Sequence, residues 1–144
     1  MTREEKKAWL YRYQDSLHRQ EILAFQIKTA WSGATSIKTT YSGAVTAPTG
    51  LHADRVADAV QRIDELKRKY VAEVEQSCQI YDEIQTAIGA LPDIMQIMAS
   101  YYRYLQGMKV DCICSKLDCS KTTVTRLLSN ALDALDIPED ALEK

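Results

Sequence analysis

Three of the four cysteines in this sequence, Cys112, Cys114 and Cys119, fall within eight consecutive positions. Clustered thiols can bind zinc, whose sulfur ligands lie about 2.3 Å from the ion and therefore roughly 4 Å from one another. In a helix, however, residues two apart point about 200° away from each other, and residues seven apart are separated by about 10 Å along the axis. The two histidines, His18 and His52, lie elsewhere in the chain. The spacing therefore predicts no metal site.

A cysteine nucleophile needs a neighbouring base or a cationic pocket that stabilises its thiolate. Lysines flank the three cysteines, but no histidine accompanies them. We interpret Cys114 and Cys119 as small core residues, Cys112 as partly exposed, and Cys78 as filler beside a helical stripe. The sequence also lacks paired acids with a histidine and a phosphate-binding glycine loop, so we expect no enzymatic activity and no cofactor.

The same stretch fits a helix-turn-helix when its polar and apolar faces are considered. Residues 110–117 suffice for two helical turns, and Asp118 tolerates the left-handed backbone that a tight turn needs. Ser120 is a strong N-cap for a second helix over residues 121–135. Four apolar residues are placed where the two helices cross: Ile113, Leu117, Val124 and Leu127. The residues predicted to contact DNA are Lys109, Lys116, Ser120, Lys121, Thr122, Thr123, Thr125, Arg126 and Ser129.

These side chains have the chemistry that duplex DNA requires. Threonine hydroxyls and methyls contact bases or phosphates, and arginine forms paired hydrogen bonds to guanine or phosphate. The free amides at the start of the second helix can hold a phosphate. A helical hairpin that only caps a bundle has the same pattern, and the pattern alone leaves both interpretations open.

The elements that must position this segment are also helical, and the fold class is predicted to be all-α. Residues 1–31 are expected to form a long helix, followed by a flexible Ser/Thr/Gly/Pro loop over 32–51 and a second long helix over 52–88. A small helix-turn-helix domain should occupy 89–136, ahead of an acidic tail over 137–144.

The two long helices carry apolar residues at steps of three, four or seven, which predicts an antiparallel, coiled-coil-like hairpin or a dimer seam. In the first helix the stripe contains Trp9, Tyr13, Leu17, Ala24, Ile27 and Trp31. In the second helix it contains Val56, Val60, Ile63, Leu66, Tyr70, Val74, Ser77, Tyr81, Ile84 and Ile88.

Charge and hydropathy limit the classes of function. No stretch of about eighteen apolar residues would span a membrane, and no apolar signal core precedes the first helix, so a cytoplasmic protein with reduced cysteines is expected. The formal net charge is −2, which argues against nonspecific coating of nucleic acid. From Gly89 onward, six Lys and Arg stand against eight Asp and Glu. A dimer or a polymerase partner would raise the effective concentration of such a domain on DNA.

The C-terminal segment resembles small phage and prophage late-gene regulators of the RinA and ArpU type, whose helix-turn-helix is similar to sigma factor region 4. The matching positions are Arg103-Tyr104, Gly107, Lys109-Val110, Ile113-Cys114, Leu117-Asp118-Cys119-Ser120, Val124-Thr125-Arg126 and Ala131-Leu132. The chain departs from the family pattern where Lys109 replaces a capping Ser, Val110 a Trp, Cys114 an Ala and Cys119 an aromatic residue. The long upstream helices also fit this family.

The resemblance implies a sequence-specific transcriptional regulator that places residues 120–129 in a major groove of double-stranded DNA. It implies that the long helices mediate homodimerisation or contact RNA polymerase. Two rivals remain: a DNA-packaging subunit similar to a small terminase, and an interaction module whose helix-turn-helix has lost DNA contact.

Overall fold

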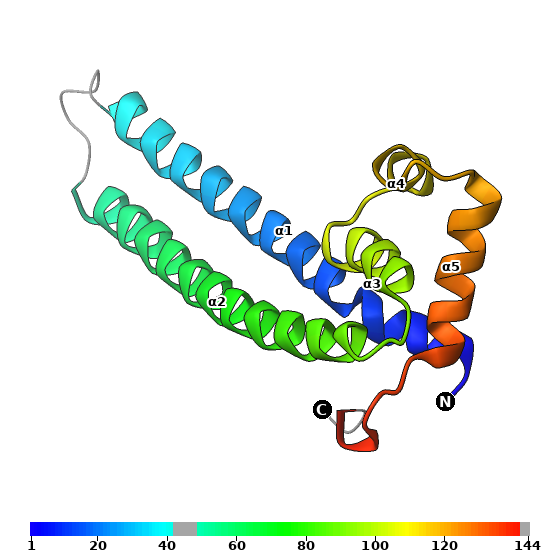
Figure 1. Cartoon of the computed structure of the whole chain (residues 1–144). Coiled ribbons are helices and arrows are strands. Elements are labelled where there is room, and N and C mark those ends of the chain that lie inside the picture. The colour runs from blue at the N-terminus through cyan, green and yellow to red at the C-terminus, as the bar shows by residue number, and fades with distance from the viewer. Residues whose placement is uncertain (42–48, 142–144) are drawn as a thin grey trace. The chain divides into compact units, whose positions relative to one another are not determined.

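The computed structural model describes residues 1–41 and 49–141, and every regular element in these ranges is helical. Figure 1 labels the main helices in chain order. In chain order, the elements of the described ranges are α1 (Arg3–Tyr41), α2 (Thr49–Gly89), α3 (Ile94–Ser100), the π-helix η1 (Tyr101–Leu105), α4 (Val110–Leu117), α5 (Lys121–Ala134) and the 3-10 turn η2 (Glu139–Ala141). The predicted all-α fold is confirmed. None of these helices is long and apolar enough to cross a lipid bilayer.

The described residues form two compact units, and α1 and α2 each contribute to both. One unit, here called the hairpin unit, contains residues 17–76. The other, here called the C-terminal unit, contains residues 1–16 together with 77–144.

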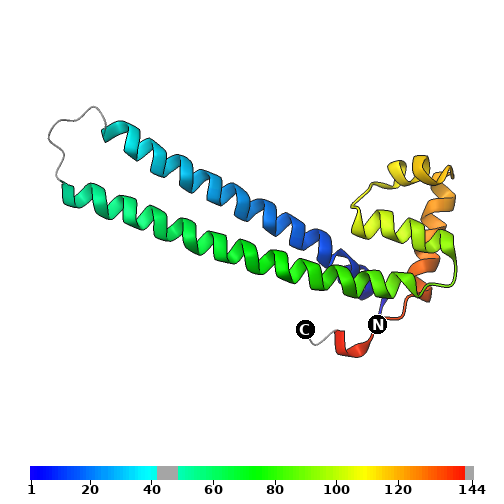
Figure 2. The ribbon, with the colours of Figure 1, turned by 60° about the vertical axis from the view of Figure 1, so that its left-hand side comes forward.

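In the hairpin unit, α1 and α2 run antiparallel and pack along their length, as Figure 2 shows. Ile63 and Leu66 of α2 are buried at the seam. Two contacts join the helices: Arg19 donates to Glu73 at 2.8 Å, and the Lys67 ammonium lies 5.4 Å from the centre of the Trp31 ring. The predicted helical hairpin is therefore confirmed.

The predicted stripe is too wide at its edges. Ala24 and Val60 are exposed, and the Trp31 side chain is half exposed. A helix that packs against one partner buries only the stripe facing that partner, so residues at the margin stay open to solvent.

The predicted loop is also too long. Residues 32–41 belong to α1 and residues 49–51 to α2, while 42–48 lie outside the described residues. Glycine costs about 1 kcal/mol in a helix relative to alanine, and serine and threonine cost less, whereas proline costs about 3 kcal/mol. The sequence has no proline between residues 32 and 41. The weak helix propensities of its glycine, serine and threonine residues are therefore not enough to end α1 at residue 31.

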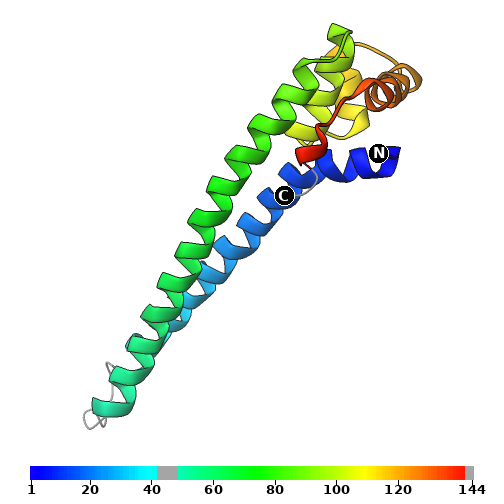
Figure 3. The same cartoon turned by 90° about the horizontal axis from the view of Figure 1, so that it is seen from below.

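The C-terminal unit has one hydrophobic core that joins the first turns of α1, the end of α2, and the short helices. Figure 3 shows the start of α1 beside α5. Leu10, Ile84 and Leu132 are among its buried members. Ile137 is buried in the same core, so the segment after α5 is anchored at its start and does not fray there.

Two local features define where α3 begins and how the chain leaves η1. Asp93 caps α3 by accepting a hydrogen bond from the Met95 amide at 3.0 Å. Gly107 follows η1 with φ of +67°, and a Cβ there would lie 2.7 Å from the side-chain oxygen of Gln14. Gly107 thus meets two requirements that favour glycine, a left-handed backbone and a close approach of another side chain.

Candidate nucleic-acid interface

The predicted helix-turn-helix is present as α4, a three-residue turn and α5. Asp118 adopts the left-handed conformation, with φ of 53° and ψ of 45°, and the Cys119 amide donates back to the Cys114 carbonyl at 3.1 Å. Ser120 is the N-cap of α5, and its hydroxyl oxygen accepts from the Thr123 amide at 3.2 Å. Asp118 and Ser120 therefore have the conformations predicted for them.

The two helices are braced by apolar side chains at their contact. Ile113 of α4 and Val124 of α5 are both 0% exposed. Leu117 and Leu127 are half-buried beside them. This brace leaves the opposite face of α5 turned to solvent.

Seven of the nine predicted contact residues are exposed. These are Lys109, Lys116, Ser120, Lys121, Thr122, Thr125 and Arg126, whereas Thr123 and Ser129 are half-buried.

Three of the predicted hydroxyl contacts are already engaged within α5. The Ser120 and Thr123 hydroxyl oxygens lie 2.9 Å apart, and Thr125 donates to the Lys121 carbonyl at 2.8 Å. The Lys121 ammonium and the Arg126 guanidinium form no ion pair within the described ranges. Lys121, Thr122 and Arg126 are therefore the side chains best placed to reach an outside ligand.

Charge is distributed unevenly along α5. Lys121 and Arg126 occupy its first turns, while Asp133 lies near its other end, about 18 Å along the axis from Lys121 and about 10 Å from Arg126. Arg3 donates to both Asp133 oxygens, at 2.7 and 2.5 Å, and this contact holds the pKa of the Asp133 carboxyl below its usual range. Five of the eight acidic residues counted from Gly89 onward thus come at or after Asp133 in the sequence, whereas the exposed Asp111 and Asp118 lie next to predicted contact residues.

The residues of α1 that hold α5 in place were not predicted from the sequence. The Lys6 ammonium donates to the carbonyls of Leu132 at 2.9 Å and Leu135 at 2.8 Å. Gln14 of α1 holds η1 in the same way, because its side-chain amide donates to the carbonyls of Tyr104 and Leu105, at 3.1 and 3.3 Å. No local pattern signals these contacts, because the paired residues are separated by 90 positions or more.

The cysteines take no part in a metal site among the described residues. Cys114 and Cys119 are half-buried rather than core residues, and the Cys119 thiol lies 3.3 Å from the Leu117 carbonyl. Cys112 is exposed, and Cys78 is exposed as well. The description of Cys78 as filler was wrong.

Comparison with protein-family models, curated proteins and solved structures found no match to this chain. No residue role can therefore be transferred from a relative. The interpretation of Lys121 and Arg126 depends on the geometry of α4 and α5 themselves.

Proposed function

We propose that the chain is a sequence-specific DNA-binding transcriptional regulator whose recognition helix is α5. Its first turns would enter a major groove, where Arg126 and Lys121 contact guanine or phosphate and Thr122 contacts a base edge. Lys109 and Lys116 would contact the DNA backbone beside the groove.

The observation that carries this proposal is the pairing of a fully buried brace with an uncommitted polar face. Val124 is 0% exposed, while its neighbours Lys121, Thr122 and Arg126 are open to solvent. Among the described residues, a hairpin that only caps a bundle has no need for two cations without an ion pair beside an exposed Thr122 in the first two turns of its second helix.

The modest positive charge favours a regulator that does not act as an isolated monomer. Two cations on α5 and two on or beside α4 neutralise few phosphates, so the salt-dependent part of the affinity is small. A homodimer, or RNA polymerase holding the domain at a promoter, would compensate by raising effective concentration.

Selection of purified full-length protein against random duplexes tests this proposal. We expect enrichment of a discrete motif, and Arg126→Ala should weaken binding to it by about 1–3 kcal/mol. Arg68→Ala removes the same charge from the exposed outer surface of α2 and serves as the matched control. Failure to enrich any sequence would instead favour an interaction module.

The rival packaging function predicts a different assembly. A subunit similar to a small terminase would form a ring of about eight or nine copies, and a regulator would form a dimer. Light scattering of the full chain separates these outcomes by mass.

A further inference from the structure

We propose that two copies of this chain associate through one lateral face of the hairpin unit, with α2 of one copy antiparallel to α2 of the other. The proposal concerns self-association alone and does not depend on DNA binding. It rests on a row of four charged residues in α2 and on an exposed aromatic residue beside that row.

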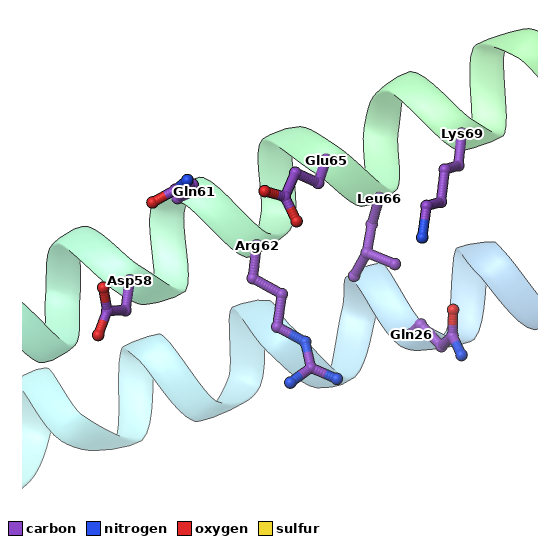
Figure 4. Close-up of a pocket in the computed structure, with 7 residues that line it drawn as sticks. All are labelled: Gln26, Asp58, Gln61, Arg62, Glu65, Leu66 and Lys69. Carbon is purple, nitrogen blue, oxygen red and sulfur yellow. The ribbon is translucent and has the colours of Figure 1, made fainter.

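The charged row, here called the α2 charge row, consists of Asp58, Arg62, Glu65 and Lys69. Spacings of four, three and four place all four residues on one face of the helix. They line a single groove, and Figure 4 shows Arg62 and Lys69 directed from α2 toward α1. Within the described residues, none of the four forms an ion pair.

The order of charges in the row is self-complementary only for antiparallel copies. The combinations Asp58 with Lys69 and Arg62 with Glu65 share one midpoint, between residues 63 and 64. A two-fold axis perpendicular to α2 at this midpoint places each acid opposite a base of the second copy. A parallel arrangement would instead place every charge opposite its own equivalent, and like charges in direct contact are unfavourable.

The same axis brings an exposed ring against a groove. Phe25 of α1 is 70% exposed and borders a groove of about 390 Å³ that it shares with Arg62. The groove contains small side chains, and a Cβ added at Gly33 would meet nothing within 4 Å. Its small lining residues are Ala30, Gly33, Ala34 and Ala59.

The register of the hairpin decides where this ring falls in the second copy. Because Arg19 pairs with Glu73, the midpoint of the α2 charge row lies level with residues 28 and 29 of α1. The two-fold axis therefore places Phe25 level with residue 32 of the second copy, beside the space over Gly33. By symmetry the contact occurs twice, and each copy contributes one ring and one groove.

Ile22 extends the apolar part of this face. Its side chain is 58% exposed and lines the next groove along the hairpin with Lys69. Protein interfaces typically have an apolar centre and a polar rim. The exposed aliphatic and aromatic residues of this face, with complementary charges beside them, fit that composition.

Charge reversal in the full-length chain tests the arrangement. Arg62→Glu alone sets two acids against each other at both symmetric contacts, and Glu65→Arg alone sets two bases against each other. We expect each single variant to raise the dimer dissociation constant by about tenfold or more in sedimentation equilibrium. An equimolar mixture of the two variants should recover dimers that contain one copy of each, and the double variant Arg62→Glu/Glu65→Arg should recover homodimers.

Two controls distinguish this interface from an effect of net charge and from ion pairs within a single α2 helix. Arg68→Glu changes the net charge as Arg62→Glu does, but Arg68 lies about 120° around α2 from Arg62, so this variant should leave dimerisation unchanged. If the row only made pairs within α2, Asp58 with Arg62 and Glu65 with Lys69, the double variant would be the worst of the set, because it places like charges four residues apart.

The outcomes that overturn the proposal are specific. The proposal fails if the wild-type chain is a monomer at about 100 µM or if it forms a ring in place of a dimer. It also fails if Arg62→Glu does not raise the dimer dissociation constant above that of Arg68→Glu. Phe25→Ala should weaken the dimer more than Val71→Ala, which truncates an exposed residue on the other side of α2. The reverse order would place the interface on that other side and would also refute the proposal. None of these measurements involves DNA, so their outcome does not depend on whether the duplex selection enriches a sequence.

Discussion

The ammonium group of Lys6, in the first turns of α1, lies 2.8 Å from the carbonyl oxygen of Leu135, the C-cap residue of α5. It also donates to the Leu132 carbonyl at 2.9 Å. The last carbonyls of a helix lack hydrogen-bond partners within the helix and carry the negative end of its dipole. A cation there donates hydrogen bonds to these carbonyls and also interacts favourably with the dipole. The N-terminal turns of the chain thus hold the far end of the proposed recognition helix.

Replacing this cation should loosen α5. We expect Lys6→Met to lower the free energy of unfolding by about 1–2 kcal/mol, because two charge-assisted hydrogen bonds to backbone carbonyls are lost while most of the aliphatic stem is kept. Urea denaturation followed by circular dichroism measures the change. Lys7→Met is the matched control, since the Lys7 ammonium pairs with Glu4, one turn away in the same helix, at 3.5 Å. Equal losses in the two variants would contradict the capping role of Lys6.

The Arg3–Asp133 contact predicts a pH dependence at acidic pH. The folded-state pKa of Asp133 is lowered, chiefly by the side-chain hydrogen bond from Arg3. A carboxyl with a depressed pKa stabilises the fold above its unfolded value, and this contribution is lost as the pH falls through the folded-state pKa. In a side-chain NMR titration, Arg3→Gln should raise the midpoint of Asp133 toward its ordinary value. Arg3→Lys, which keeps the charge but loses the paired geometry, should give an intermediate midpoint. An unchanged midpoint in Arg3→Gln would show that Arg3 does not cause the shift.

The left-handed turn residue offers a stabilising substitution. Asp118 has φ of 53°, a conformation that glycine adopts without steric cost. We therefore expect Asp118→Gly to raise the free energy of unfolding by about 0.5–1 kcal/mol. Asp111→Gly, within α4, should lower it by up to about 1 kcal/mol, because the helical backbone there gains nothing from glycine. A decrease in both variants would mean that the Asp118 carboxylate itself stabilises the turn.

The helix-turn-helix was predictable because its signals are local. Asp118, Ser120 and the run of apolar residues from Val124 each act through neighbours within about five positions, and propensity and capping rules describe that range well. The apolar spacing likewise indicated the hairpin, since a repeat of three and four over many turns has few other solutions.

Features that depend on distant contacts were not predictable in the same way. The exposure of Val60 depends on which side of α2 faces α1, and the spacing of apolar residues in α2 alone does not reveal this. The anchoring of α5 by Arg3 and Lys6 joins residues more than 125 positions apart. The extension of α1 to Tyr41 passes through glycine, serine and threonine residues, which have weak helix propensities but, unlike proline, do not break a helix.

The two cations of α5 should differ in how they affect DNA binding, if the proposed function holds. Lys121 lies at the first position of α5 and is a flexible point charge suited to phosphate, whereas Arg126 carries the planar fork that matches guanine. Lys121→Gln should therefore weaken binding about equally on selected and unrelated duplexes and reduce the salt slope by about 1. Arg126→Gln should also relax the sequence preference at one base pair. Fluorescence anisotropy over a series of salt concentrations, on a selected duplex and on single-base variants of it, measures both effects. If Lys121→Gln lost sequence preference at a base pair while its salt slope stayed unchanged, the roles assigned to Lys121 and Arg126 would be exchanged.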